Sequence, residues 1–218
     1  LNYEIEPKIL APHLPYGTEL DYLNGKTYVS LVAFMFYRTK ALGLVPAFFH
    51  QTFEEINLRF YVIRKHGDEI RRGVVFIKEI VPKPILAYVA RTFYHENYVA
   101  MKTKSRITEG TSYEYTWGEN HLHVASTNEM IEALPNSPER WITEHYWGYT
   151  KISAGRTYEY QVKHPVWNLY GVRDHSLTGD MGSLYGQEFA QVFTAPPSSV
   201  FVADGSELTV HMPTLIRS

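Results

Sequence analysis

The 218-residue chain carries 21 basic and 23 acidic side chains, a formal net charge of −2, and contains no cysteine. This charge offers no electrostatic footprint for nucleic acid or an acidic membrane surface. The lack of cysteine excludes disulfides, thiolate nucleophiles and Cys-ligated zinc. The length fits a single domain over residues 1–218. No apolar run approaches the roughly 20 residues of a membrane span, and the lack of a leader-like N-terminus predicts a cytoplasmic location.

Two hairpins are predicted near the start of the chain. Asn24-Gly25 is a strong signal for a tight turn between two strands, and Gly67-Asp68 marks a second one. The strands that these turns join are residues 19–23 with 26–38, and residues 54–65 with 71–81.

Further short strands alternate with a few helical segments. The helical segments are predicted at residues 7–14, 85–94, 138–147 and 181–193, and a packed loop at 39–52. The remaining strands are predicted at residues 98–107, 111–117, 121–126, 156–162, 166–173, 199–203 and 208–212. Many antiparallel strands with three or four inserted helices predict an α+β fold, mainly antiparallel β.

The strand over residues 54–63 has an unusual polar face. Its apolar face consists of Ile56, Leu58, Phe60 and Val62. Its other face consists of Glu55, Asn57, Arg59 and Tyr61. Side chains that both donate and accept bidentate hydrogen bonds would suit a polar pocket inside a barrel or sandwich. A solvated face with local Glu–Arg contacts is the alternative.

The pairing register decides which charged residue joins this face. Depending on the register, either Lys78 or Glu79 lies beside Asn57 and Arg59, because a one-residue slip exchanges the two faces. Glu79 is preferred, since a buried Arg59 needs carboxylate partners and an unpaired buried lysine costs several kcal/mol. Glu55 and Glu79 are therefore the candidate acid–base residues.

Two other motifs could carry chemistry. His121 and His123 share one strand face, but no third ligand lies at a diagnostic offset, so a surface pair is expected and no metal is predicted. In the helix capped by Ser137, Glu144 and His145 could reach the same cavity as the polar face, or could belong to an amphipathic surface helix.

Several segments together carry a family resemblance. They are Leu14-Pro15-Tyr16-Gly17-Thr18-Glu19-Leu20-Asp21, Tyr28-Val29-Ser30-Leu31-Val32, Phe53-Glu54-Glu55-Ile56-Asn57-Leu58-Arg59-Phe60-Tyr61-Val62, Gly73-Val74-Val75-Phe76, Tyr98-Val99-Ala100-Met101 and Thr143-Glu144-His145-Tyr146-Trp147. The chain resembles the YqjF-like bacterial proteins of unknown function, which belong to the acetoacetate decarboxylase-like superfamily. The resemblance implies a strongly bent antiparallel sheet, closed as a cone or barrel around an internal cavity.

The resemblance does not extend to the decarboxylase lysine. Those enzymes use a Schiff-base lysine from an adjacent pair beyond a Gly-Arg-Glu-Leu-like stretch. The similar stretch here is Ala90-Arg91-Thr92-Phe93, the lysine position falls near Asn97-Tyr98, and no lysine occurs between Pro84 and Met101. The cavity glutamate of those enzymes has a counterpart in Glu54 or Glu55.

We therefore expect a polar cavity that binds, and could transform, a small oxo-acid or related carbonyl compound without that lysine. A non-catalytic small-molecule-binding or partner-binding scaffold is the alternative. No cofactor is expected, a carboxylic acid is a candidate ligand, and a homo-oligomer stays open. The candidate ligand-binding residues are Asn57, Arg59, Tyr61, Tyr98, Glu144 and His145. Arg59 either anchors an anionic ligand or pairs with Glu55 or Glu79.

Overall fold

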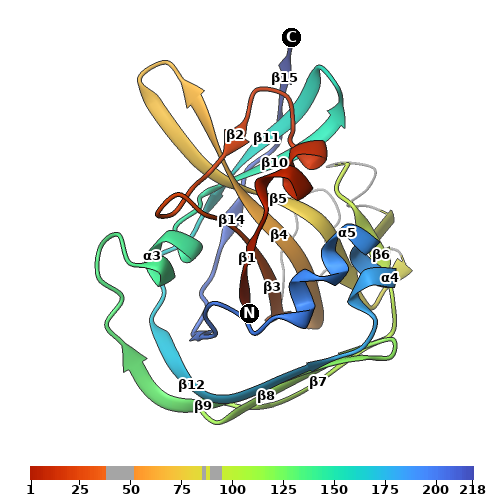
Figure 1. Ribbon diagram of the computed structural model, residues 1–218, viewed down its shortest axis with the longest axis vertical. Coiled ribbons are helices and arrows are strands. Elements are labelled where there is room, and N and C mark those ends of the chain that lie inside the picture. Colours follow the sequence, from red (N-terminus) through yellow and green to blue (C-terminus); the bar gives the residue numbers. More distant parts are fainter. Residues whose placement is uncertain (38–51, 85–86, 89–94) are drawn as a thin grey trace.

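A computed structural model describes residues 1–37, 52–84, 87–88 and 95–218 (Figure 1). The strands are β1 (Asn2–Ile5), β2 (Glu19–Leu20), β3 (Thr27–Phe36), β4 (Phe53–His66), β5 (Glu69–Val81), β6 (Tyr98–Ala100), β7 (Thr103–Thr108), β8 (Ser112–Trp117), β9 (Asn120–Ile131), β10 (Trp147–Ser153), β11 (Arg156–Lys163), β12 (Leu169–Thr178), β13 (Val202–Ala203), β14 (Thr209–Val210) and β15 (Thr214–Arg217). The helices are α1 (Pro7–Leu10), α3 (Pro138–Thr143), α4 (Met181–Tyr185) and α5 (Gln187–Ala190), with 3-10 turns at Ala11–His13 and Val192–Thr194. No helix among the described residues is long and apolar enough to cross a membrane.

The strands form two sheets, which confirms the mainly β prediction. The first sheet has the order β1-β3-β4-β5-β10-β11-β14, with β2 on β4, β6 on β5 and β15 on β11. The second sheet has the order β13-β12-β9-β8-β7, and its long curved strands run along the bottom of the view in Figure 1. Most pairs are antiparallel, but β5 pairs in parallel with both β6 and β10.

The predicted closure into a cone or barrel is wrong for the described residues. The first sheet ends at β1 and β14, and these two edges do not pair with each other. The free edge of β1 is instead met by the C-terminal part of the chain, where the Asn2 backbone N–H donates to Ser199 O at 2.9 Å. An edge covered by a single bridge leaves the sheet open.

One large apolar core lies between the two sheets. Residues of the first sheet such as Val29 and Leu58 belong to the same buried cluster as Trp117 and Leu122 of the second sheet. Leu58 comes from the apolar face of β4, so the alternation in the sequence correctly predicted which face turns to the core.

The two predicted hairpin turns form, with one difference in pairing. Asn24 and Gly25 have φ angles of 52° and 77°, and Leu23 and Lys26 close the turn as a bridge. Beyond that bridge β2 leaves β3 and pairs with β4. The β4–β5 hairpin forms around Gly67 and is longer than expected, with pairs from His66–Glu69 to Ile56–Ile80.

Two helix predictions are wrong in extent. Ser137 caps α3 as expected, accepting from the Arg140 backbone N–H at 3.3 Å, but α3 ends at Thr143. The chain then enters β10 at Trp147, because pairing in the first sheet overrides local helix propensity. The helix expected over residues 181–193 is broken at Gly186, whose φ is 118°. The loop predicted at 39–52 and the helix predicted at 85–94 fall mostly outside the described residues.

The ends of the chain differ from prediction too. The short terminal strands β13 and β14 do not pair with each other but with β12 and β11, and β1 and β15 were not predicted. Strands of only four residues, such as β1 and β15, give at most a weak period-two signal.

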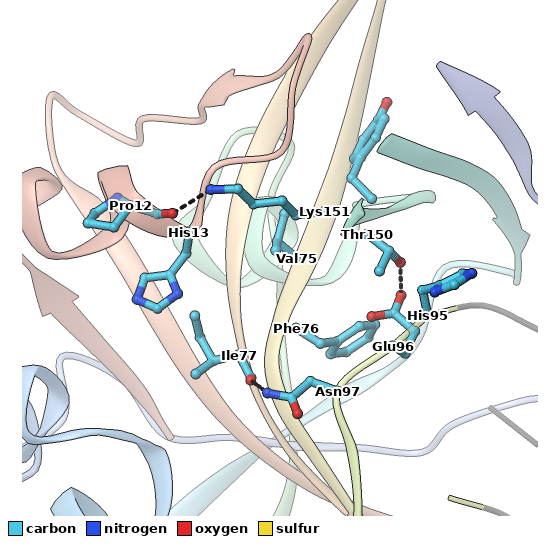
Figure 2. A pocket seen from close by; sticks show the side chains of 11 residues that line it. Pro12, His13, Val75, Phe76, Ile77, His95, Glu96, Asn97, Thr150 and Lys151 are labelled. Atoms are coloured by element: carbon cyan, nitrogen blue, oxygen red, sulfur yellow. Dashed lines mark hydrogen bonds between the residues drawn. The ribbon is translucent and has the colours of Figure 1, made fainter. Parts of the chain in front are cut away.

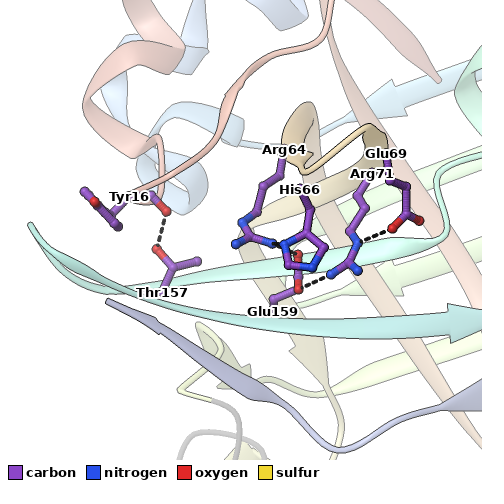
Figure 3. A network of polar contacts seen from close by, with 7 residues as sticks. All are labelled: Tyr16, Arg64, His66, Glu69, Arg71, Thr157 and Glu159. Carbon is purple, nitrogen blue, oxygen red and sulfur yellow. Dashed lines mark hydrogen bonds and ion pairs between the residues drawn. The ribbon is translucent and has the colours of Figure 1, made fainter. Parts of the chain in front are cut away.

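A buried carboxylate ties the tip of the β4–β5 hairpin to β11. Glu159 of β11 accepts from Arg64 Nη1 at 3.0 Å and from Arg71 Nη1 at 2.7 Å, as Figure 3 shows. Arg71 also stacks over the Trp147 ring, at 4.2 Å from its centroid. These contacts fix the long hairpin against β10 and β11, the two strands that supply part of the candidate site.

Candidate functional site

The polar face of β4 is buried on the side of the first sheet opposite the main core. Glu55 and Asn57 are 3% and 1% exposed, so the interpretation as a solvated face is wrong for these two residues. Asn57 Nδ2 donates to Glu55 Oε1 at 3.0 Å, and Tyr98 of β6 donates its hydroxyl to Glu55 Oε2 at 3.0 Å. Glu54, the other proposed counterpart of the decarboxylase glutamate, turns to β7 and accepts from Thr103 and Ser105.

A bulge in β5 sets which charged residue joins this face. Leu58 pairs with Lys78 but Arg59 pairs with Phe76, so Ile77 is an extra residue and the alternation shifts there. Glu79 lies directly opposite Asn57, on the polar face, and is 3% exposed. Lys78 lies with Leu58 on the other face and donates to the Leu184 carbonyl.

A third buried carboxyl joins Glu55 and Glu79. Glu96 lies two residues before the start of β6 and is 5% exposed. Its Oε1 accepts from Thr150 Oγ1 at 2.5 Å and from the Tyr160 hydroxyl at 2.7 Å, which come from β10 and β11. We call Glu55, Glu79 and Glu96 the carboxyl cluster.

Burial makes the carboxyl cluster hold protons near neutral pH. Desolvation raises the pKa of Glu55 to about 7, although hydrogen bonds from Asn57 and Tyr98 oppose the rise. Desolvation likewise raises the pKa of Glu96 to about 7, against hydrogen bonds from Thr150 and Tyr160. The pKa of Glu79 is raised well above its ordinary value by burial and by the charges of Glu96 and Glu55. At neutral pH the cluster therefore contains both a proton donor and a proton acceptor.

Three polar atoms on this face have no hydrogen-bond partner among the described residues. They are Arg59 Nε, Asn57 Oδ1 and Glu79 Oε2, and all three are shielded from solvent. Of the two alternatives for Arg59, an ion pair with Glu55 or Glu79 is not found, because Arg59 forms no ion pair with a residue that the structure describes. Its charge still opposes the rise in the pKa of Glu55. Its guanidinium carbon lies 6.0 Å from the centroid of the Tyr61 ring.

One member of the carboxyl cluster, Glu96, lines a cleft (Figure 2). It has a volume of about 170 Å³ and lies where β5 and β10 diverge beyond their parallel pairing at Gly73–Val74 and Trp147–Gly148. Its polar lining consists of His13, His95, Glu96, Asn97, Thr150 and Lys151. At about 30 Å³ per water molecule, this volume suits a small organic acid.

The other predicted ligand-binding residues lie in a separate cluster. His145 Nε2 contacts Asp21 Oδ2 at 3.0 Å, and Arg72 Nε donates to the same oxygen at 2.8 Å. Burial lowers the pKa of His145 to about 4, despite the Asp21 carboxylate beside it, so the imidazole is neutral at pH 7. Tyr61 shares a hydrogen bond of 2.6 Å with Ser30. The structure therefore does not bring His145 to the carboxyl cluster.

Glu144 forms an ion pair with Arg140 at 3.0 Å and has no recorded hydrogen bond to the carboxyl cluster among the described residues. The two histidines that share a strand face, His121 and His123, are half-buried on β9. Within the described ranges no group of three or more His, Asp or Glu side chains is arranged to hold a metal ion.

Sequence reasoning missed Glu96, Thr150 and Tyr160. The alternation of Glu96 with Tyr98 places both side chains in phase with the polar row, and this was the available signal. Thr150 and Tyr160 carried no signal of their own, because their strands reach the site through a parallel pairing more than 70 residues away along the chain.

Comparison with solved structures identifies the fold. The enduracididine biosynthesis enzyme MppR complexed with pyruvate matches with a TM-score of 0.64 and 12% identity, over 98% of this chain and 85% of that one. Acetoacetate decarboxylase from Legionella pneumophila subsp. pneumophila str. Philadelphia 1 matches with a TM-score of 0.58 and 12% identity, over 99% and 80% of the two chains. The fold is therefore acetoacetate decarboxylase-like.

The chain belongs to DUF2071, a family of uncharacterized conserved proteins whose model matches residues 1–207. It is 27% identical to the uncharacterized protein YqjF of Bacillus subtilis (strain 168) over 177 residues, which cover 77% of this chain and 70% of YqjF. The resemblance to YqjF-like proteins seen in the sequence is confirmed.

Proposed function

We propose that the carboxyl cluster binds a small oxo-acid or related carbonyl compound and moves a proton on the carbon next to its carbonyl group. The observation that carries this proposal is the burial of three carboxyls, Glu55, Glu79 and Glu96. Burial raises the pKa of Glu55 and of Glu96 to about 7 and raises the pKa of Glu79 well above its ordinary value. Groups that hold and release protons near pH 7 are suited to general acid–base catalysis.

The roles follow from the raised pKa values. Glu79, whose pKa burial raises well above its ordinary value, serves as the acid and donates a hydrogen bond to the ligand's carbonyl oxygen. Glu55 in its carboxylate form takes a proton from the adjacent carbon, the C–H electron pair becomes the new C=C bond, and the carbonyl oxygen takes the Glu79 proton to give an enol. Returning a proton to carbon completes the exchange. Glu96 lines the cleft and is the member that can exchange its proton with solvent.

The proposal uses no lysine nucleophile. Lys78 lies on the opposite face of β5 from Glu79 and donates to Leu184 O, so its amine does not lie beside the cluster. The fold neighbours support an oxo-acid ligand through their names alone, since MppR was found with pyruvate and acetoacetate is the substrate in the name of the decarboxylase.

A non-catalytic binder with the same ligand class is the second candidate. The placement of Lys78 favours it, because a cluster that this lysine cannot serve as a nucleophile could retain binding alone.

Deuterium exchange distinguishes the two candidates. The protein is incubated with pyruvate or acetoacetate in D2O near neutral pD, and the loss of the carbon-bound protons is followed by NMR. We expect exchange faster than in buffer, and we expect Glu79→Gln to lose about 10²-fold or more of the acceleration, since an amide cannot donate that proton to the oxygen. Glu109→Gln, on the exposed turn between β7 and β8, is the matched control.

Binding is measured in parallel as a ligand-dependent rise in melting temperature. A rise without exchange would favour the non-catalytic binder. If neither acid raises the melting temperature or exchanges its protons, the proposed ligand class is wrong.

A further inference from the structure

Arg59 is a half-buried cation without a described partner. Its Nε is shielded from solvent and makes no hydrogen bond to a described residue. The carboxylate nearest along the same strand face, Glu55, is already satisfied by neutral donors, since Asn57 Nδ2 and the Tyr98 hydroxyl occupy its two oxygens at 3.0 Å each. Arg59 therefore keeps its hydrogen-bonding capacity for a group outside the described chain.

Two more unsatisfied atoms lie on the same face. Asn57 is two residues before Arg59 on β4, and Glu79 lies opposite Asn57 on β5. Asn57 Oδ1 can only accept, whereas Glu79 Oε2 can donate when the carboxyl is protonated. Residues two apart on one strand face are separated by roughly 6.6 Å, which a ligand of three or four carbons spans.

The set of free atoms specifies a complementary ligand. Arg59 fits a carboxylate, which accepts two parallel hydrogen bonds from a guanidinium. Asn57 Oδ1 beside it requires a hydroxyl donor on the ligand. The enol form of a 2-oxo acid carries this pair of groups, a carboxylate and a hydroxyl on the neighbouring carbon.

We propose that Arg59, Asn57 and Glu79 recognise the carboxylate end of a 2-oxo acid, with Arg59 on the carboxylate and Asn57 on the enol hydroxyl. This assignment rests on the proposed function and narrows its ligand class. Neutral carbonyl compounds and esters lack the group that Arg59 would bind.

The test compares the binding of an acid and of its ester to the wild type and to two variants. Binding of pyruvate and methyl pyruvate is measured by calorimetry on the wild type, on Arg59→Lys and on Arg106→Lys, the matched control on the exposed face of β7. We expect pyruvate to bind the wild type at least tenfold more tightly than methyl pyruvate. Arg59→Lys should lose tenfold or more for pyruvate and change little for the ester, since an ammonium cannot reproduce the fork.

The outcomes separate the two proposals. Equal affinity for acid and ester in the wild type would overturn the role of Arg59 while leaving the proposed function standing. The role of Arg59 would also be overturned if a folded Arg59→Lys variant bound pyruvate within twofold of the wild-type affinity. If neither compound binds the wild type and no deuterium exchange occurs, both proposals fail. The wild-type comparison alone decides if Arg59→Lys does not fold.

Discussion

Replacing Glu96 by glutamine should stabilise the protein at pH 8. The pKa of Glu96 is raised from 4.5 in the unfolded chain to about 7 in the fold, chiefly because burial penalises the charged form. Between these values the folded protein holds a proton that the unfolded chain has released, so the free energy of unfolding falls as pH rises. At 1.36 kcal/mol per pKa unit, the loss by pH 8 is on the order of 3 kcal/mol.

Glutamine keeps the acceptor oxygen for Thr150 and Tyr160 and cannot ionise. The contribution of Glu96 to the free energy of unfolding is fully present below pH 4.5 and is lost as pH rises through 7. The variant should therefore be more stable than the wild type only within and above this pH range. Urea unfolding at pH 5 and pH 8 measures this, with Glu109→Gln as the exposed control. A Glu96→Gln variant less stable than wild type at pH 8 would show that the carboxylate is stabilised in place. Asp21 does not interfere, because its pKa is lowered and it titrates below this range.

Adding a methyl group at Gly148 should destabilise the fold by about 3 kcal/mol, from overpacking and from loss of a hydrogen bond to a carboxyl. Tyr160 pairs with Gly148 across β10 and β11, and a Cβ built at Gly148 would lie 2.5 Å from the Tyr160 oxygen and closer still to the ring. The ring must therefore move, and the Tyr160–Glu96 hydrogen bond of 2.7 Å is lost with it.

Gly171→Ala is the matched control, because the atom it would meet most closely is the hydroxyl of exposed Thr127, at 2.8 Å, and that side chain can turn away. Urea unfolding of both variants measures the difference. Equal stability of Gly148→Ala and wild type would mean that the close packing of Tyr160 over Gly148 carries no energetic weight.

Period-two alternation was the most informative signal in the sequence. It placed Leu58 in the core and put Glu55, Asn57 and Arg59 together on one face, and both placements hold in the structure. The register between β4 and β5 was left open by the sequence, since the bulge at Ile77 carries no glycine or other turn residue that would mark it.

Long-range pairing could not be predicted in the same way. For Glu96 the only local signal was its alternation with Tyr98. Thr150 and Tyr160 reach Glu96 because β10 and β11 follow β5 in the sheet, which local composition does not reveal. The end of α3 at Thr143 has the same cause, since Trp147 pairs with Gly73 of β5. Local composition encodes the start of such an element through its cap, whereas a partner strand elsewhere in the chain determines its end.

The short parallel seam between β5 and β10 bears on how the protein folds. It joins Gly73 and Val74 to Trp147 and Gly148, so a loop of more than 70 residues must close before the seam gains any contact energy. Hairpins such as β4–β5 and β8–β9 close much shorter loops and can form early. The hydrogen bonds from Thr150 and Tyr160 to Glu96 depend on the seam, so the site of Glu96 is completed only after this long loop has closed. The Glu96 carboxyl is therefore ionised at pH 7 until β10 and β11 arrive, and its burial is then accompanied by uptake of a proton.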